Sequence, residues 1–287
     1  MLTTVENGMG KGKLYLCATP IGNLGDMTPR CIEVLREADL IAAEDTRNSI
    51  KLLNHFDIHT PMTAYHEYNR FDKADDLVRQ MLAGKTVACI TDAGTPGISD
   101  PGEVLVQKAV EAGIEVSSIP GACAFVNALV ISGLSSRRFR FEAFLPADKK
   151  ERKAVLDEIK NDTATIVFYE APHRLLKTLE ELLEVFGDRE IALCKELTKV
   201  HESVFRTTVS AAIAHYENEP PKGEFVLVLG GADPEKLKAE QAADWEKMTV
   251  AEHVKLYEDR GIDRKEAMRL VAKDRNVSKR DIYQALL

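Results

Sequence analysis

The sequence predicts an α/β protein in which two α/β domains are followed by a small C-terminal helical domain. Through the first half of the chain, short apolar runs of strand length alternate with segments whose apolar residues have helical spacing. This alternation is typical of a parallel sheet with helices on its faces. The second half contains similar elements in a less regular order, which indicates an α+β or mixed domain.

Five strands and five helices are expected in the first half. Thr28 and Pro29 suit the N-cap and the first position of a helix, and Thr46 suits the N-cap of the next one. Gly84 and Gly113 suit the position just after a helix end. The expected strands span residues 13–18, 40–43, 62–65, 86–90 and 114–119, and the expected helices span residues 29–38, 46–53, 71–82, 103–111 and 124–131.

The second half is expected to hold strands at 139–145, 165–169, 190–195 and 203–208, and helices at 149–160 and 172–186. A last apolar run at 224–229 closes this sheet. The predicted domain limits are a flexible tail at 1–12, an N-terminal α/β domain at 13–134 and a C-terminal α/β domain at 135–230. A polar linker at 231–247 and a helical tail at 248–287 follow.

The helical tail carries two patterns that resemble capping boxes. Asp263 precedes Glu266 by three residues, and Ser278 precedes Asp281 by three. They predict two short helices separated by residues 276–277, which would form a helix-turn-helix unit. The apolar residues expected to face the interior of this unit are Ala267, Leu270, Val271, Ile282, Ala285 and Leu286.

Composition limits the possible functions. The net charge of −8 argues against broad, unspecific nucleic-acid binding, and no DNA partner is expected. The five cysteines form no C-x-x-C pair, which indicates free thiols in a reducing, cytoplasmic setting. The most apolar long window, at residues 116–134, is interrupted by Pro120 and Gly121, so no membrane span is predicted. Scattered histidines give no metal-ligand spacing, and no metal is expected.

Three loops that follow predicted strands consist mainly of Gly, Pro and small residues. They read TPIGNLGD at 19–26, TDAGTPGISDPG at 91–102 and PGACA at 120–124. Small side chains let a ligand lie against backbone N–H and C=O groups. A single loop of this kind is most simply a tight turn, but three at strand ends in one domain indicate a shared ligand cleft. Neither a G-x-x-x-x-G-K-[ST] pattern nor a strand-linked G-x-G-x-x-G is present.

Four polar clusters also follow predicted strands. They are AEDTR at 43–47, YHEYNR at 65–70, YEAPHR at 169–174 and KELTK at 195–199. Each places basic side chains beside acids at a strand end. Such clusters can bind an anionic polymer or position a proton acceptor, although any one of them can also be helix capping and surface charge.

The motifs TPIGNLGD, AEDTR, TDAGTPGISDPG, IPGA, FYEAPHR and KGEFVLV, in this order from residue 13 onward, resemble the tetrapyrrole methylase superfamily. Within it, the sequence is most similar to the bacterial enzymes that methylate the ribose 2′-hydroxyl of a cytidine in 16S ribosomal RNA. The resemblance implies two α/β domains of tetrapyrrole-methylase type with S-adenosylmethionine bound in the cleft between them. It also implies a homodimer that acts on the decoding region of the small ribosomal subunit.

Matched motif by motif, the resemblance implies a set of cofactor-binding residues in this chain. They are Pro20 and Ile21 in the first loop, Asp92, Gly94 and Thr95 in the second, and Cys123 and Ala124 in the third, with Phe168, Tyr169, Glu224 and Phe225 contributed by the second domain. Many of these contacts are expected to involve the main chain.

The implied reaction is an in-line displacement at the sulfonium methyl group by a ribose hydroxyl, in which alignment supplies much of the catalysis. A base that takes the hydroxyl proton, or a cation near the developing alkoxide, would assist. The sequence leaves the choice open. The candidate bases are Glu44, Asp45, His66, Glu67 and Glu170, and the candidate cations are Arg47, Arg174 and Lys195.

The tail is the expected RNA-binding segment, because seven basic residues and only two acidic ones lie within 264–280. The expected RNA contacts are Arg264, Lys265, Arg269, Lys273, Lys279 and Arg280, and Arg137, Arg138 and Arg140 form a possible second strip. Two alternatives stay open: a C-methyltransferase acting on a tetrapyrrole, and a non-catalytic RNA-binding factor in ribosome assembly.

Overall fold

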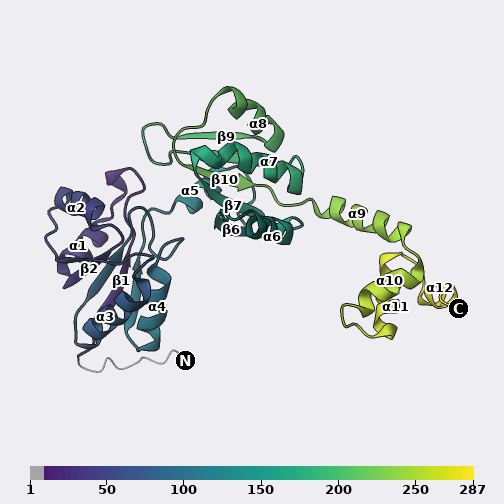
Figure 1. The fold of residues 1–287 in the computed structure, drawn as a ribbon, viewed down its shortest axis with the longest axis horizontal. Helices are drawn as coiled ribbons and strands as arrows, with labels where there is room; N and C mark the ends of the chain where they lie inside the picture. Colours follow the sequence, from purple (N-terminus) through teal and green to yellow (C-terminus); the bar gives the residue numbers. More distant parts are fainter. Residues whose placement is uncertain (1–9) are drawn as a thin grey trace.

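The computed structural model describes residues 10–287, apart from the side chains at 240–244 and 246. Most of the predicted tail at 1–12 lies outside the described residues. Two α/β domains lie next to each other, and helix α9 (Pro234–Lys247) leads from the second domain to a separate helical unit (Figure 1). Within the described residues, no helix combines the length and apolar character needed to span a membrane.

The first domain contains a five-stranded parallel sheet, as predicted. Its strands are β1 (Lys13–Cys17), β2 (Leu40–Ala43), β3 (Met62–Ala64), β4 (Val87–Ile90) and β5 (Glu115–Ile119), in the order β3-β2-β4-β1-β5. Helices α1 (Pro29–Glu37) and α2 (Thr46–His55) contribute Leu35 and Leu53 to the core on one face. Helices α3 (Arg70–Leu82) and α4 (Gly102–Glu111) contribute Leu77 and Leu105 on the other.

The helix ends of this domain follow the expected signals with one exception. Thr28 caps α1 by accepting a hydrogen bond from the N–H of Cys31. The predicted cap of α2 is wrong, because the carboxylate of Asp45 accepts from the N–H of Arg47 and Thr46 is the first helical residue. Asp45 is favoured over Thr46 at the N-cap position because a carboxylate at the N-terminal end of a helix also interacts favourably with the helix dipole.

The second domain contains a mixed sheet, as predicted. Its strands are β6 (Phe139–Phe144), β7 (Thr165–Glu170), β8 (Glu190–Lys195), β9 (Ser203–Thr208) and β10 (Phe225–Leu229), in the order β6-β7-β10-β8-β9, with only β6 and β7 parallel. The run expected to close the sheet, β10, is the last strand in the chain but not the last in the sheet. It lies in the middle, and all five of its residues are buried, which explains its unbroken apolar run.

Helices α6 (Lys149–Ile159), α7 (Leu175–Phe186) and α8 (Val209–Asn218) belong to this domain, and a short 3-10 turn, η2 (Pro172–Arg174), precedes α7. Helix α8 is absent from the sequence prediction. Helix α5 (Ala124–Ile131) packs on this second sheet, where Ala128 and Leu129 share a core with Val167 and Val226. α5 therefore joins the two domains rather than covering the first sheet.

The C-terminal unit has three helices, α10 (Val250–Glu258), α11 (Arg264–Asp274) and α12 (Lys279–Ala285), instead of the two predicted. The segment expected to be a polar linker is mostly the helix α9. Ser278 and Asp281 form the predicted capping box. Asp263 caps α11, but Glu266 pairs with Arg269 instead of completing a box. The core of the unit consists of Val254, Ala267, Met268, Val271, Ala272 and Ile282, while Ala285 is exposed, contrary to expectation.

Candidate functional site

The three small-residue loops meet at one edge of the first sheet. They follow β1, β4 and β5, which are adjacent in the order β4-β1-β5, so their carboxyl ends emerge side by side. The N–H of Thr19 donates to the carbonyl of Gly94 at 2.9 Å, and the N–H of Gly94 donates back at 3.1 Å. The hydroxyl of Thr95 donates to the carbonyl of Ala122 at 3.1 Å. The expected convergence of the loops is therefore confirmed.

Gly94 has the backbone that this convergence requires. Its φ is +91°, a conformation that other residues rarely adopt. A Cβ atom there would lie 3.4 Å from Cγ2 of Ile21 and 3.7 Å from the carbonyl oxygen of Ala122. A side chain larger than methyl at this position would therefore enter the space between the loops.

A cavity of about 460 Å³ lies between these loops and the second domain. This volume is within the range of about 300–1,000 Å³ typical of small-molecule and cofactor sites. The wall from the first domain and α5 consists of Ile21, Ala93, Gly94, Thr95, Ile98, Ser99, Asp100, Cys123 and Ala124, and the wall from the second domain consists of Phe144, Tyr169, Glu170, Ala171, Pro172, Glu224, Phe225 and Val226.

Eight of the eleven residues expected to bind the cofactor line this cavity. They are Ile21, Gly94, Thr95, Cys123, Ala124, Tyr169, Glu224 and Phe225. Pro20 is buried beside the cavity, and Asp92 accepts a hydrogen bond from the side chain of Asn48 outside it. Phe168 is 0% exposed and packs in the core on the opposite face of β7 from Tyr169. Its side chain does not reach the cavity, because successive residues of a strand face opposite ways.

Asp100 is a cavity residue that the sequence analysis missed. Burial raises the pKa of its carboxyl to about 6, and the nearby negative charge of Glu44 adds to this effect. The only sequence signal was its place in the loop 91–102. A carboxyl that is costly to ionise inside a cavity fits a ligand that brings positive charge.

Glu44 acts behind the cavity. Its Oε2 accepts hydrogen bonds from the Thr91 hydroxyl at 2.5 Å and from the N–H of Asp92 at 3.3 Å. Thr91 in turn accepts, at its carbonyl, from the hydroxyl of Thr19 at 3.0 Å. Glu44 therefore holds the start of the loop 91–102 in place and does not line the cavity.

Residues 13–213 match the family of Tetrapyrrole (Corrin/Porphyrin) Methylases. The chain belongs to this family. The match confirms the enzyme class expected from the sequence, a methyltransferase, and S-adenosylmethionine as its methyl donor. The cavity suits the donor, since small residues and backbone form one wall and an ionisable carboxylate is available for a cationic ligand.

Similar proteins support the assignment. A ribosomal RNA small subunit methyltransferase I of Halalkalibacterium halodurans is 48% identical over 273 residues, which cover 95% of this chain and 94% of that protein. The protein of the same name from Thermotoga maritima is 45% identical over 222 residues, which cover 77% of this chain and all of that protein. This relative is therefore shorter by roughly the combined size of residues 1–12 and 234–287.

Solved structures of the same fold have lower identity. Diphthine synthase has a TM-score of 0.61 at 14% identity, with 76% of this chain and 90% of that chain covered. Uroporphyrin-III C-methyltransferase from Thermus thermophilus, solved in complex with S-adenosylhomocysteine, has a TM-score of 0.54 at 19% identity, with 76% and 97% covered. These likenesses confirm the predicted fold of the methylase domains.

Of the predicted catalytic residues of this methylase, only Glu170 lines the cavity. Its side chain is almost fully buried, and it accepts hydrogen bonds from the Thr178 hydroxyl and from the N–H of Ala171. Arg174 lies 3.6 Å from Glu170 and donates to the carbonyl of Leu145 at 2.8 Å. These contacts fix the turn that follows β6 on the second-domain wall.

The other predicted catalytic residues lie outside the cavity. Asp45 forms an ion pair with Arg47 at 2.8 Å, and this pairing holds the pKa of the Asp45 carboxyl low, at about 2. His66 and Glu67 follow the edge strand β3, which lies three strand positions, or about 14 Å, from β1, and neither residue lines the cavity. Lys195 ends β8, outside the cavity lining.

One contact beside the cavity holds α5 on the second domain, and another joins the two domains. The N–H of Phe125, at the start of α5, donates to the hydroxyl of Tyr169 at 3.3 Å, and burial raises the pKa of Tyr169 to about 12. On the other side, a Cβ atom at Gly22 would lie only 2.4 Å from Cγ of Lys199. Lys199 also forms an ion pair with Glu224 at 2.7 Å.

The expected RNA contacts are only partly free. In the tail, Lys265, Lys273, Lys279 and Arg280 are exposed, while Arg264 and Arg269 pair with acids on their own surface. Arg275, part of the basic window, instead donates to the backbone carbonyls of Trp245, Met248 and Thr249. In the second domain, Arg140 pairs with Glu142 and Glu158.

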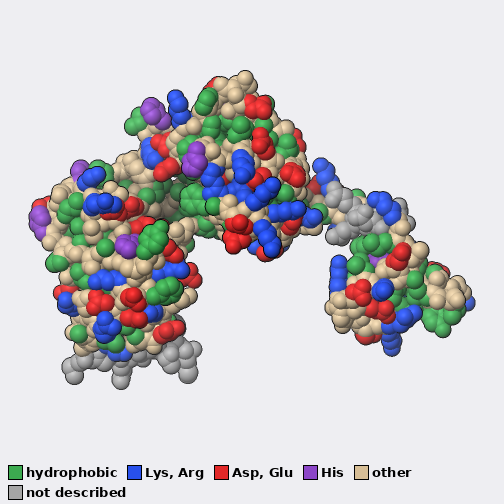
Figure 2. Space-filling view, viewed as in Figure 1, with side chains coloured by type: hydrophobic (Ala, Val, Ile, Leu, Met, Phe, Trp, Pro, Cys, Tyr) green, Lys and Arg blue, Asp and Glu red, His purple; other side chains and the backbone are tan. Residues whose placement is uncertain are grey.

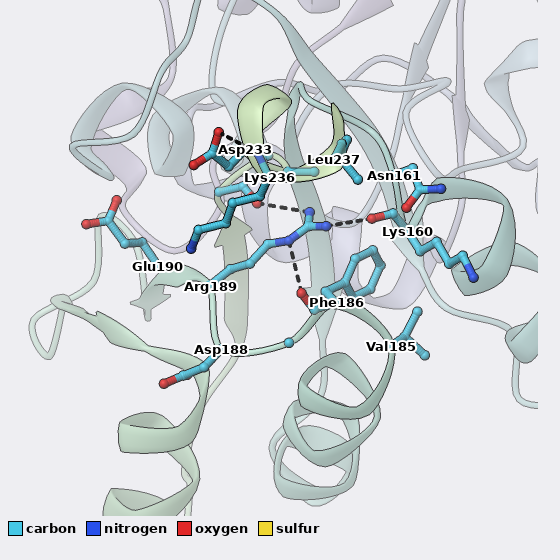
Figure 3. A pocket seen from close by; sticks show the side chains of 14 residues that line it. Lys160, Asn161, Val185, Phe186, Asp188, Arg189, Glu190, Asp233, Lys236 and Leu237 are labelled. Carbon is cyan, nitrogen blue, oxygen red and sulfur yellow. Dashed lines mark hydrogen bonds between the residues drawn. The ribbon is translucent and has the colours of Figure 1, made fainter. Parts of the chain in front are cut away.

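A second cavity, of about 690 Å³, lies at the opposite end of the second sheet (Figure 3). Arg189 lines this cavity, and its guanidinium donates to the carbonyls of Lys160, Phe186 and Gly230 at 2.5, 3.2 and 3.4 Å. Lys160 and Phe186 lie at the C-terminal ends of α6 and α7, where carbonyls lack partners within the helix. We therefore interpret Arg189 as a structural clamp.

Proposed function

We propose that the protein transfers the methyl group of S-adenosylmethionine to the ribose 2′-hydroxyl of a cytidine in the decoding region of 16S ribosomal RNA. The observation that carries the proposal is the interdomain cavity built by three small-residue loops. The names of relatives at 39–48% identity, which refer to the small-subunit ribosomal RNA, supply the substrate class.

Bound in the cavity, the donor supplies an electrophilic methyl group on a sulfonium centre. The loops 91–102 and 120–124 would hold the donor largely through backbone groups, since most of their side chains at the cavity are small. Asp100 would balance its positive charge. Tyr169, held by the N–H of Phe125, forms part of the wall from the second domain. The protein would then act mainly by aligning the hydroxyl with the methyl group.

The contacts of the cavity carboxylates limit which of them could act as the proposed base. Three carboxylates line the cavity. Glu224 pairs with Lys199 and Glu170 lies 3.6 Å from Arg174, whereas Asp100 forms no ion pair within the part of the chain that the structure describes. Glu170 already accepts two hydrogen bonds, whereas the pKa of Asp100, at about 6, is suited to proton uptake near neutral pH. Asp100 is therefore the first carboxylate to test in either role, as a charge partner of the donor or as a base.

The proposal includes a cytoplasmic homodimer and an accessory role for the tail. The shorter Thermotoga maritima relative carries the same name, which supports a catalytic unit formed by the two α/β domains. The tail unit, with its exposed Lys265, Lys273, Lys279 and Arg280, would then add affinity for RNA phosphates.

The test uses small ribosomal subunits that lack the modification and S-adenosylmethionine labelled in the methyl group. We expect label in 16S RNA and resistance of one linkage to alkaline cleavage, because a 2′-O-methyl group removes the attacking hydroxyl. A Gly94→Val variant, which fills the space between the loops, is the matched control and should transfer no label. Label on a base, or none from the wild-type protein, would contradict the proposal.

A further inference from the structure

Phe144 is an exposed aromatic side chain on the wall of the cavity, at the end of β6. It is 54% exposed, and its ring centroid lies 5.5 Å from that of Tyr169. An exposed phenylalanine is common on protein surfaces, so exposure alone indicates nothing. What distinguishes Phe144 is the backbone that places it there.

A β-bulge in β6 turns Phe144 toward the cavity. Phe141 pairs with Val167, and the register then shifts so that Ala143 pairs with Phe168 and Phe144 with Tyr169. Without the extra residue, Phe144 would pair with the next residue of β7 and face α6 and α7, on the opposite side of the sheet.

The bulge carries backbone strain. Ala143 has a φ of +52°, a left-handed conformation that costs a residue with a Cβ atom about 1–2 kcal/mol. Strain of this kind concentrates at functional sites, where it orients a side chain. The hydrogen bond from Arg174 to the carbonyl of Leu145, the residue after Phe144, holds the strand end in this position.

Positive charge follows directly after Phe144. The turn 145–148 leads into α6, whose first turns carry Lys149, Lys150 and Lys153, all exposed. Among the residues that the structure describes, none of these lysines forms an ion pair. Figure 2 shows Lys and Arg side chains gathered on this part of the second domain. The backbone N–H groups of Lys150 and Glu151 are already capped by Asp148, so the lysine side chains are the available cations.

We propose that Phe144 is the stacking platform for the unpaired base of the target nucleotide, and that Lys149, Lys150 and Lys153 bind the phosphates beside it. An aromatic face next to a basic strip is the combination that binds unstacked, single-stranded RNA. A base placed on Phe144 leaves its ribose at the mouth of the cavity. This inference rests on the proposed RNA substrate and adds how the α/β domains recognise it without the tail.

The test compares Phe144→Ala with Phe144→Tyr and with Phe139→Ala. Phe139 is a matched control, since it is 46% exposed but begins β6, about 17 Å from Phe144 and outside the cavity lining. With unmodified small subunits, Phe144→Ala should lower kcat/KM for RNA by about 5- to 150-fold, the range that stacking one base supports. Phe144→Tyr should retain most of the activity, and Phe139→Ala should equal the wild type.

Two further measurements complete the test. Calorimetry with S-adenosylmethionine should give the same Kd for Phe144→Ala and the wild type. In the Lys149→Ala, Lys150→Ala double variant, the slope of log K for RNA binding against log salt concentration should become shallower by about 0.7 for each lysine removed. Unchanged kcat/KM for Phe144→Ala, or a loss explained by a weaker donor Kd, would overturn the inference. The methylated position in the wild-type product is determined separately. A methyl group on a base would reject the proposed reaction, whereas the ratio of kcat/KM between Phe144→Ala and the wild type would still test whether Phe144 stacks on a base.

Discussion

Replacing Asp100 with asparagine should make the unliganded protein more stable at pH 7 and weaken its affinity for S-adenosylmethionine. The pKa of this carboxyl rises from 3.8 to about 6 on folding, mainly through burial. The folded protein therefore holds the proton more tightly than the unfolded chain does. The resulting cost to stability is absent below about pH 4, grows as the pH rises, and is complete above about pH 6.

The magnitude follows from the pKa. The full shift in pKa corresponds to about 3 kcal/mol of unfolding free energy. Because Asp100 is partly exposed, the expected gain in unfolding free energy for Asp100→Asn is smaller, about 1–2 kcal/mol at pH 7. Urea unfolding at pH 7.5 and pH 5 measures it, and the gain at pH 5 should be roughly half as large. Asp157→Asn is the matched control, because Asp157 is exposed on α6 and lies outside the cavity lining.

Donor binding should change in the opposite direction. The donor brings a sulfonium and an ammonium group, so losing a charged partner should raise Kd by about 10- to 150-fold, equivalent to about 1.5–3 kcal/mol. In the wild type, protonation of Asp100 should raise Kd by about tenfold between pH 7 and pH 5, whereas the asparagine variant should show no such dependence. Calorimetry measures both. An asparagine variant that is less stable at pH 7, or that binds the donor like the wild type, would refute the reasoning.

Three further predictions concern regions away from the cavity. Replacing Arg189 with methionine should cost about 2–4 kcal/mol, a decrease in Tm of about 4–12 °C, because three carbonyls lose their donor, and Arg189→Lys should recover little of it. Truncation after residue 233 should weaken RNA binding and its salt dependence while donor Kd stays constant; equal RNA affinity would reject the role of the tail. His253 is buried between Trp245 and Tyr257, and burial lowers its pKa, so the neutral ring is favoured and the tail should lose stability as the pH falls below about 6.5. Fluorescence of Trp245, the only tryptophan, should report this loss, and a pH-independent signal would contradict it.

Local sequence signals were sufficient for the sheets and for the convergence of the loops. Apolar runs alternating with helical spacing define the first domain, and the small residues at 91–102 have a direct role in the turn around Gly94. The start of α9 was also readable, since Asp233 before Pro234 is a strong N-cap signal. The neighbouring glycines and the polar composition favoured a linker, and its helical conformation was not predicted.

The orientation of individual side chains was less accessible. Counting in steps of two along β6 assigns Phe144 to the wrong face, because a single extra residue reverses the register and no turn-forming residue marks it. The same alternation places Phe168 and Tyr169 on opposite faces of β7, so only one of them can reach the cavity. Motif matching alone had assigned both to the cofactor. The pKa of Asp100 depends on burial and on Glu44, and neighbours brought together only by the fold cannot be read from the loop itself.

Helix α5 has a consequence for how the molecule moves. Its first residues, Cys123 and Ala124, line the cavity, while Ala128 and Leu129 are packed into the second sheet, and Arg206 clasps the carbonyls of Ile131 and Ser132. The helix must therefore travel with the second domain. The hinge for a change in the angle between the domains would therefore lie at residues 120–123. A molecule that contacts both Gly94 and Ala124 would bridge this hinge and restrict the motion.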